Sequence, residues 1–125
     1  MIWTRRTWMR LGVVSALCAV ISSLLAFRLQ DAGAQSMIRL GSGFQFMHAM
    51  ATIACATFIQ VGARNARHAP AFFLVGSAIF SGSLYARAAG VWDGGDLALA
   101  LGAALAAGGW GALLIAGADI DGGDA

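Results

Sequence analysis

Long apolar runs separated by short polar segments dominate the sequence. The first two read LGVVSALCAVISSLLAF and FQFMHAMATIACATFIQVGA, and two more follow in the second half of the chain. Each run is close to the roughly 20 residues that a helix needs to cross a hydrocarbon core about 30 Å thick. A membrane β-barrel would instead show alternating segments of about ten residues. The pattern predicts an all-α integral membrane protein, an antiparallel four-helix bundle with helices at about 8–28, 44–63, 71–89 and 97–118.

The segments between these predicted helices carry turn signals. ARNARHA precedes Pro70, the only proline, which suits the first turn of a new helix. GVWDGGD holds glycines and aspartates, which are typical of a chain reversal. The tail DIDGGDA is too polar and too short to fold by itself. Without an internal repeat or a low-complexity linker, residues 1–125 are expected to form one membrane domain.

Composition supports the membrane class. Hydrophobic residues make up 59% of the chain and charged residues 11%, whereas soluble domains are roughly half apolar and a quarter charged. Lysine and glutamate are absent, and eight arginines against six aspartates give a net charge of +2 without a dense basic run. A nucleic-acid partner is therefore not expected. Cys18 and Cys55 each fall inside an apolar run, where a thiol behaves as a small hydrophobe.

The arginines predict an orientation, because positive residues near the ends of membrane helices favour the cytoplasmic side. Both termini are then cytoplasmic, in a bacterial inner (plasma) membrane. One side of the predicted membrane carries Arg5, Arg6, Arg10, Arg64 and Arg67, and the other carries Arg28, Arg39 and Arg87.

The N-terminal segment allows a competing interpretation. TRRTWMRLG, followed by an apolar run and AGAQ, resembles a twin-arginine export signal with a cleavage site after Ala34. Against this interpretation, the remaining chain would still hold three apolar runs, which an exported soluble protein does not need. An intact N-terminus in the mature protein would exclude the signal.

Small residues recur at helical spacing and predict close helix packing, because van der Waals contact drives helix association in lipid. The predicted fourth helix has one such row through Ala98, Gly102 and Ala106, and a second row through Ala103, Ala107 and Gly111. That helix is therefore expected at the centre of the bundle or at a contact between subunits. The residues predicted to pack between helices are Gly76, Gly82, Ala98, Gly102 and Ala106.

Polar residues inside the runs predict a cluster near the outer membrane face. By helix rise, His48 of the second helix and Tyr85 of the third both lie about 6–8 Å below that face. Ionisable groups inside a membrane usually face the bundle interior and find a partner. The cluster forms either a structural hydrogen-bond network or a ligand or proton site, with Asp93 and Asp96 as counter-charges for an arginine. Its candidate ligand-binding residues are Gln45, His48, Ser81, Ser83, Tyr85 and Arg87.

The sequence lacks the residues that several common cofactor, metal and catalytic sites require. Bis-histidine haem ligation needs two imidazoles at one depth, whereas His48 and His68 are expected at opposite ends of the second helix. The chain shows no metal-ligand spacing, no nucleophile–base–acid set and no phosphate-binding loop. We therefore expect no cofactor, no metal site and no catalytic residue, and the protein is predicted not to be an enzyme.

One segment carries a family resemblance. FFLVGSAIFSGSLYARAAG, preceded by FQFMHAMA and followed by LALALGAALAAGGWGALLIA, resembles the small membrane proteins of the domain of unknown function 423 family. Animal mitochondrial transmembrane protein 256 is similar to that family. The resemblance covers Phe44 to Ile115 and implies a four-helix inner-membrane or mitochondrial-type protein without an established activity. Family members usually carry a GAFGAHGL-like stretch after the first helix, whereas this chain reads AFRLQDAGAQSMIRL and lacks that histidine.

Two hypotheses about function follow. The first is a non-enzymatic accessory or structural subunit that packs against a larger membrane complex, for example a respiratory one, or against further copies of itself, in contact with membrane lipid. The second is a protein that binds or transports a quinone, a lipid or a small solute through the polar cluster near the outer face. Histidine suits proton-coupled work because its charge can change near neutral pH.

Overall fold

Four long helices make up most of the structure, a computed structural model that describes residues 4–121. They are α1 (Arg5–Ala26), α2 (Ala32–Gln60), α3 (Ala69–Ala88) and α4 (Leu97–Asp121), and a short 3-10 helix, η1 (Arg64–His68), precedes α3. Residues 4–121 contain no strand. The all-α prediction is confirmed. The polar tail is helical as far as Asp121, and its remaining residues, 122–125, lie outside the described part.

The second helix is longer than the sequence pattern predicted. It begins at Ala32, not at residue 44, because Asp31 caps its first turn by accepting a hydrogen bond from the Ala34 backbone N–H at 2.8 Å. The segment AGAQSMIRLGSG that follows contains no proline and several good helix formers. Its polar residues made it resemble a loop. The AGAQ sequence of the proposed export-signal cleavage site lies in the first turns of α2.

Glycines end α2 and α3 in the same way. Gly62 (φ 110°) and Gly90 (φ 71°) adopt the left-handed conformation that glycine reaches without strain. The next residue in each case, Ala63 or Val91, donates its backbone N–H back to a carbonyl in the last helical turn. Beyond Gly62 the predicted turn ARNARHA forms η1, and Pro70 occupies the first turn of α3 as expected.

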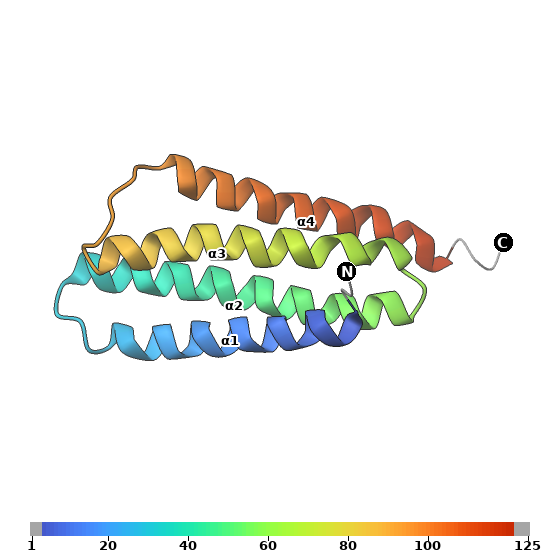
Figure 1. Cartoon of the computed structure of the whole chain (residues 1–125), viewed down its shortest axis with the longest axis horizontal. Helices are drawn as coiled ribbons and strands as arrows, with labels where there is room; N and C mark the ends of the chain where they lie inside the picture. Colours follow the sequence, from blue (N-terminus) through green and yellow to red (C-terminus); the bar gives the residue numbers. More distant parts are fainter. Residues whose placement is uncertain (1–3, 122–125) are drawn as a thin grey trace.

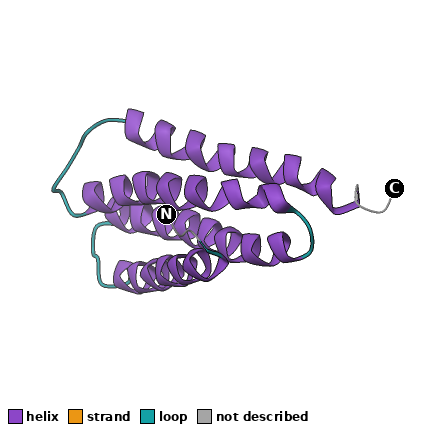
Figure 2. Ribbon diagram, turned by 45° about the vertical axis from the view of Figure 1, so that its right-hand side comes forward, coloured by secondary structure: helices purple, strands orange, loops and turns teal. Residues whose placement is uncertain are grey.

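Each helix packs mainly against its neighbours in sequence. Figure 1 shows the chain reversing direction at each loop, with both ends of the chain at the same end of the molecule. Contacts join α1 to α2, α2 to α3 and α3 to α4, while α1 and α3 touch only slightly. Figures 1 and 2 both show α1 and α4 on opposite sides of the α2–α3 pair. The four-helix bundle is therefore a row of neighbours, and η1 packs against α2, α3 and α4 at one end.

Small residues allow the closest helix contacts. A Cβ atom added at Gly102 of α4 would lie 2.6 Å from the Phe80 backbone nitrogen, and one at Gly76 of α3 would lie 2.7 Å from the Ala106 nitrogen. Of the residues predicted to pack between helices, Gly76, Gly102 and Ala106 are buried here and Ala98 is half-buried. Gly82 corrects the prediction: it is exposed, with open space where a Cβ would lie, because it faces away from both neighbouring helices.

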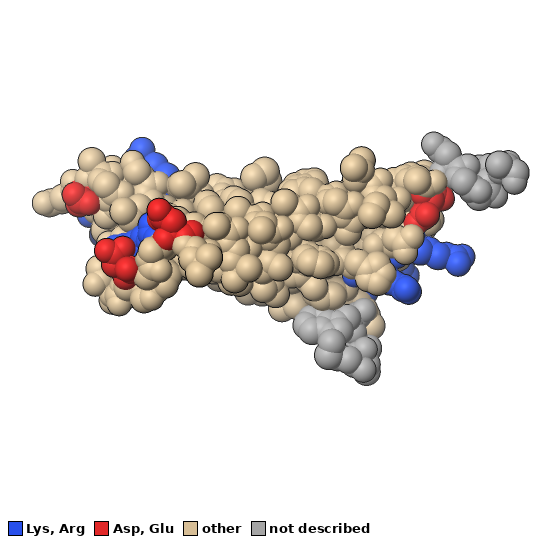
Figure 3. All heavy atoms as spheres, turned by 90° about the horizontal axis from the view of Figure 1, so that it is seen from above, with Lys and Arg blue, Asp and Glu red and all other residues tan. Residues whose placement is uncertain are grey.

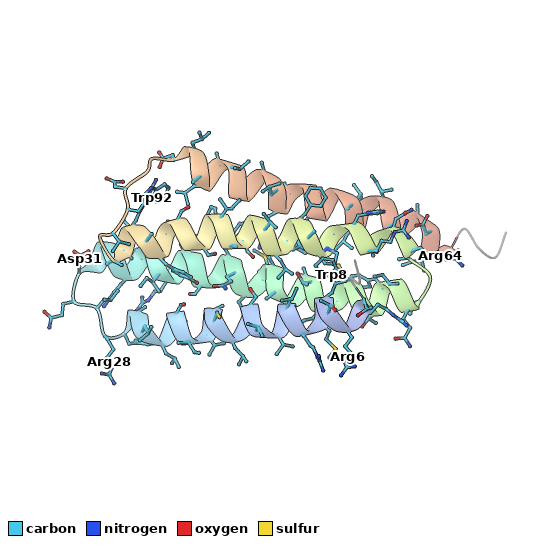
Figure 4. All side chains as sticks on the ribbon, in the orientation of Figure 1. Arg6, Trp8, Arg28, Asp31, Arg64 and Trp92 are labelled. Carbon is cyan, nitrogen blue, oxygen red and sulfur yellow. The ribbon has the colours of Figure 1, made fainter. Side chains whose placement is uncertain are left out.

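The outer surface of the bundle is apolar along its middle. All four helices are long and apolar enough to cross a membrane. Large side chains such as Leu24 (62% exposed) and Leu114 (82% exposed) point away from the core. Figure 3 shows charged residues gathered near the two ends of the visible face, with an uncharged surface between them. In Figure 4, Arg28 and Asp31 lie at one end of the molecule and Arg64 at the other.

Candidate functional site

His48 is the most enclosed ionisable side chain among the predicted site residues. It lies in the middle of α2 and is 3% exposed. Its Nδ1 is 2.7 Å from the carbonyl oxygen of Phe44, one turn earlier, and its Nε2 is 3.2 Å from the indole Nε1 of Trp110 in α4. An indole N–H can only donate, so Nε2 accepts this bond and Nδ1 carries the proton that is donated to Phe44. Both ring nitrogens of the neutral imidazole are therefore satisfied within the chain.

Aromatic rings surround this imidazole. Its centroid lies 4.2 Å from that of Phe44, 5.6 Å from that of Phe73 and 6.0 Å from that of Trp110, the last in an edge-on arrangement. Phe44 also stacks on Phe80 of α3 at 4.0 Å, and Phe73 meets Trp110 edge-on at 5.0 Å. The rings come from α2, α3 and α4, so this cluster joins three helices around one polar contact.

A second polar chain joins α1, α2 and α3. Tyr85 of α3 donates its hydroxyl hydrogen to Gln45 Oε1 of α2 at 2.8 Å. Gln45 Nε2 in turn donates to Ser15 Oγ of α1 at 3.3 Å. We call Ser15, Gln45 and Tyr85 the polar bridge. Because α1 and α3 scarcely touch, this bridge connects them by way of α2.

The two serines of the predicted cluster have different partners. Ser81 donates to the Gly41 carbonyl of α2 at 2.6 Å and so links two helices. Ser83 donates to the Ile79 carbonyl of its own helix at 2.6 Å. Neither hydroxyl needs an outside ligand, since each is buried and already has an acceptor.

Arg87 lies at the end of α3 that is opposite the chain termini. Its Nη2 contacts Asp96 Oδ1 at 3.1 Å and also donates to the Gly95 carbonyl. Asp96 is thus the counter-charge that the sequence suggested. Asp93 lines the same 440 Å³ pocket as Arg87 but is not within ion-pair distance of it. Arg87 Nε is buried and has no hydrogen-bond partner among residues 4–121.

The predicted single cluster is divided into separate groups. His48 bonds Trp110, Gln45 bonds Tyr85, Ser81 bonds Gly41, and Arg87 bonds Asp96. The Tyr85 hydroxyl bonds Gln45, about one turn before His48 in α2, whereas His48 bonds Trp110.

Sequence reasoning missed Trp110 as a partner of His48. The signal was present: between Leu97 and Ala118, Trp110 is the only side chain with a polar atom, so its indole N–H needed an acceptor on a neighbouring helix. Ser15 of α1 accepts the hydrogen bond that ends the polar bridge. Within residues 4–121, no group of three His, Cys, Asp or Glu side chains lies close enough to hold a metal ion.

The two sides of α4 differ in burial. Gly102, Ala106, Gly109 and Ala116 are buried against the rest of the bundle. The opposite side is exposed, and its middle part consists of small residues, with large apolar side chains such as Leu97 and Leu114 toward its ends. We call it the open face of α4, and it comprises Ala100, Ala103, Ala104, Ala107 and Gly111.

A known protein family matches most of the chain. The sequence profile of a family described as a protein of unknown function, DUF423, matches residues 16–109. The chain belongs to the DUF423 family. The match begins inside α1, so it includes the segment between Phe27 and Gly43 in which the sequence pattern departs from that family. Searches of curated proteins and of solved structures gave no significant match to this DUF423 protein.

Proposed function

We propose that this DUF423 protein is an integral membrane protein whose four antiparallel helices each cross the bilayer. The proposal is supported by the apolar surface between the charged ends. Exposed side chains such as Leu17, Leu101 and Ile115 would face water in a soluble protein, where large apolar patches are rare. In lipid the same side chains cost nothing, and the helices satisfy their own backbone polar groups.

The charge distribution supports an orientation in a bacterial inner membrane. Arg5, Arg6 and Arg64 lie at the end that holds both chain termini, and Arg28 lies at the other (Figure 4). The end with more arginines is assigned to the cytoplasm. Both termini and η1 are then cytoplasmic, and the α1–α2 and α3–α4 loops face outward.

Within the membrane, the protein is proposed to act as a non-enzymatic accessory subunit that docks a helix of another membrane protein on the open face of α4. The exposed small residues of that face carry this proposal. In lipid, helices associate where small side chains let their backbones approach, as Gly76 and Gly102 do between α3 and α4. The open face repeats that composition and has no partner helix within the described residues.

The polar groups support a structural role and not a reaction. Both nitrogens of His48 have partners inside the chain, and the Tyr85 hydroxyl is bonded to Gln45. A proton carrier or a ligand site needs a group that can exchange its partner with a bound molecule. The polar cluster near the outer face, proposed from sequence as a quinone, lipid or solute site, has no such free nitrogen at His48.

A pair of glycine substitutions tests the docking proposal. Gly111→Leu places a large side chain on the open face, and Gly82→Leu makes the same change on an exposed part of α3; neither site has atoms within 4 Å of an added Cβ. Each variant is extracted from native membranes in mild detergent and sized beside the unmodified protein. We expect the unmodified protein and Gly82→Leu to migrate with a partner, and Gly111→Leu to migrate alone with an unchanged unfolding midpoint.

The partner is then identified by mass spectrometry, which separates a different membrane protein from a second copy of this chain. A lone monomer for the unmodified protein would refute docking. Equal loss of the partner in both variants would place the interface elsewhere.

A further inference from the structure

An apolar groove of about 410 Å³ lies between α2 and α4, near the end of the bundle that holds the chain termini. α2 and α4 do not form one of the main helix pairs, and η1 packs against both of them at this end. The floor of the groove consists of the small, buried residues Ala63, Ala66 and Ala116. Larger apolar side chains line its sides, among them the exposed Phe58 of α2 and Leu114 of α4. The groove is therefore an apolar surface that is open to the surroundings of the bundle.

The groove is about as long as one membrane leaflet is deep. Along α4 its lining residues run from Trp110 to Ile120, a rise of about 15 Å. One leaflet contributes about 15 Å to a hydrocarbon core of about 30 Å. At the inner end of the groove, the Trp110 indole bonds His48 and so joins α4 to α2. In a membrane the groove would thus extend from the surface nearest the chain termini to about the middle of the bilayer.

A polar pocket of about 740 Å³ adjoins the groove where α4 ends, and the two share Ile120. Arg64 and Arg67 of η1 both line this pocket and are exposed. Residues three apart in a 3-10 helix lie above one another, because that helix has about three residues per turn. The two arginine side chains therefore lie on one side of η1, whereas Ala66 is buried on another.

The charges of the pocket favour an anion. Neither arginine forms an ion pair within residues 4–121, where the one ion pair lies at the other end of the molecule. Asp119 also lines the pocket, and its carboxylate accepts a hydrogen bond from Asn65 Nδ2 at 2.9 Å. Arg67 Nε donates to His68 Nε2 at 3.4 Å, which leaves its Nη groups for another acceptor. Two arginines against one aspartate give the described lining a net charge of +1.

We propose that the groove and the pocket together bind one anionic phospholipid of the leaflet nearest the chain termini. Its phosphate lies in the pocket beside Arg64 and Arg67, and one acyl chain lies along Phe58 and Leu114 in the groove. The shared Ile120 joins the charged pocket to the apolar groove in the order of a lipid headgroup and its tail. A membrane-spanning helix in the groove would leave the two arginines without an anion, whereas a phospholipid supplies one at the correct end.

This inference rests on the membrane insertion proposed above. It does not depend on the docking of another helix, because no residue of the open face of α4 lines the groove or the pocket.

The lipid preference can be measured by native mass spectrometry. The full chain, purified in detergent, is titrated with phosphatidylglycerol or with phosphatidylcholine that carries the same acyl chains. One net positive charge near the membrane surface favours an anionic lipid by about fivefold, so we expect phosphatidylglycerol to bind about fivefold more tightly. Arg64→Gln/Arg67→Gln leaves Asp119 as the described charge of the pocket, and this preference is expected to fall by roughly 25-fold.

Arg5→Gln/Arg6→Gln is the matched control, because it removes the same charge from the same end of the molecule. Arg5 and Arg6 belong to α1, which lies on the opposite side of the α2–α3 pair from α4 (Figures 1 and 2), and neither lines the pocket. This control is expected to change the preference by less than about twofold. An equal loss in the two double variants would overturn the proposal. Equal affinity of the unmodified protein for the two lipids would also overturn it, and is the result expected if acidic residues of the chain's own tail, such as Asp124, filled the pocket.

Filling the groove tests the position of the acyl chain. Gly117 lines the groove, and a Cβ added there meets no atom within 4 Å, so Gly117→Phe can place a ring in the groove. Gly82→Phe makes the same change on an exposed part of α3, also with no atom within 4 Å of the added Cβ. We expect Gly117→Phe to lose most of its binding of both lipids and Gly82→Phe to bind them as the unmodified protein does. If circular dichroism melting shows that Gly117→Phe does not fold, the smaller Gly117→Leu takes its place. Folded, groove-filled protein that binds lipid as before would overturn the site.

A failure of membrane insertion gives a different result from a failure of the lipid site. A chain that alkaline carbonate washes off native membranes would refute insertion itself. A chain that stays in the membrane but shows no lipid preference would refute only the lipid site.

Discussion

Replacing Gly102 with alanine tests whether the α3–α4 contact depends on missing side chains. The new Cβ would lie 2.6 Å from the Phe80 backbone nitrogen and 2.8 Å from the Gly76 carbonyl oxygen. Ordinary contact begins near 3.4 Å, so α4 must move by about 0.8 Å, the difference between 3.4 and 2.6 Å. The obstacle is backbone, which cannot rotate away. A gap of that size forfeits a quarter to a half of the dispersion energy of each affected contact.

The expected cost combines two opposing terms. Overpacking a close contact costs about 1–3 kcal/mol, and replacing glycine by alanine inside a helix returns up to about 1 kcal/mol. With that full return, Gly102→Ala should therefore lower the free energy of unfolding by up to about 2 kcal/mol. Gly111→Ala is the matched control, because it lies on the open face of the same helix with no atoms within 4 Å of the new Cβ. That control should gain up to about 1 kcal/mol.

Reversible unfolding in mixed micelles with increasing sodium dodecyl sulfate, followed by circular dichroism, measures both changes. The two substitutions are chemically identical, so a difference between them reports the contact itself. Equal shifts in the same direction would refute the reasoning. They would mean that α4 is not held close to α3 when the protein is in a lipid-like solvent.

Two further predictions concern the polar core and the orientation. Trp110→Phe keeps an aromatic ring but removes the donor to His48 Nε2, so the free energy of unfolding should fall by about 1–3 kcal/mol. Trp92→Phe, in the exposed α3–α4 loop, should leave the same melting curve unchanged. Equal melting curves for the two variants would contradict the hydrogen bond between Trp110 and His48. In a background without Cys18 and Cys55, Asn65→Cys should react with a membrane-impermeant maleimide only from the cytoplasmic side and Gln30→Cys only from the outer side. The reverse labelling pattern would invert the proposed orientation.

The helices could be predicted from sequence because their signals are local. Unbroken apolar runs, Pro70 and the glycines of the loops located α3 and α4 to within a few residues. The start of α2 could not be found in this way, because the segment from Ala32 to Gly43 is too polar to resemble a membrane-spanning run. It is helical because Asp31 caps its first turn and because it extends the apolar central part of α2. Hydropathy finds the part of a helix that suits lipid and not the part that extends past it.

The site was harder to predict because it depends on depth and rotation. The polar residues were identified, but their depths along each helix did not indicate which of them pair: Tyr85 bonds Gln45, and His48 bonds Trp110. Spacing along one helix fixes which residues share a face. It does not fix which neighbouring helix that face meets, so the bond between His48 and Trp110 required the three-dimensional arrangement.

The row of neighbouring contacts has a consequence for how the protein is made. As α1 and α2 leave the ribosome they can already pair, α3 can then pack against α2, and α4 can pack against α3. Each newly synthesised segment meets a surface that is already in the membrane, so none has to wait for a later part of the chain. Assembly can therefore keep pace with translation, and the last segment inserted is also the one that leaves a side available to a separately synthesised protein.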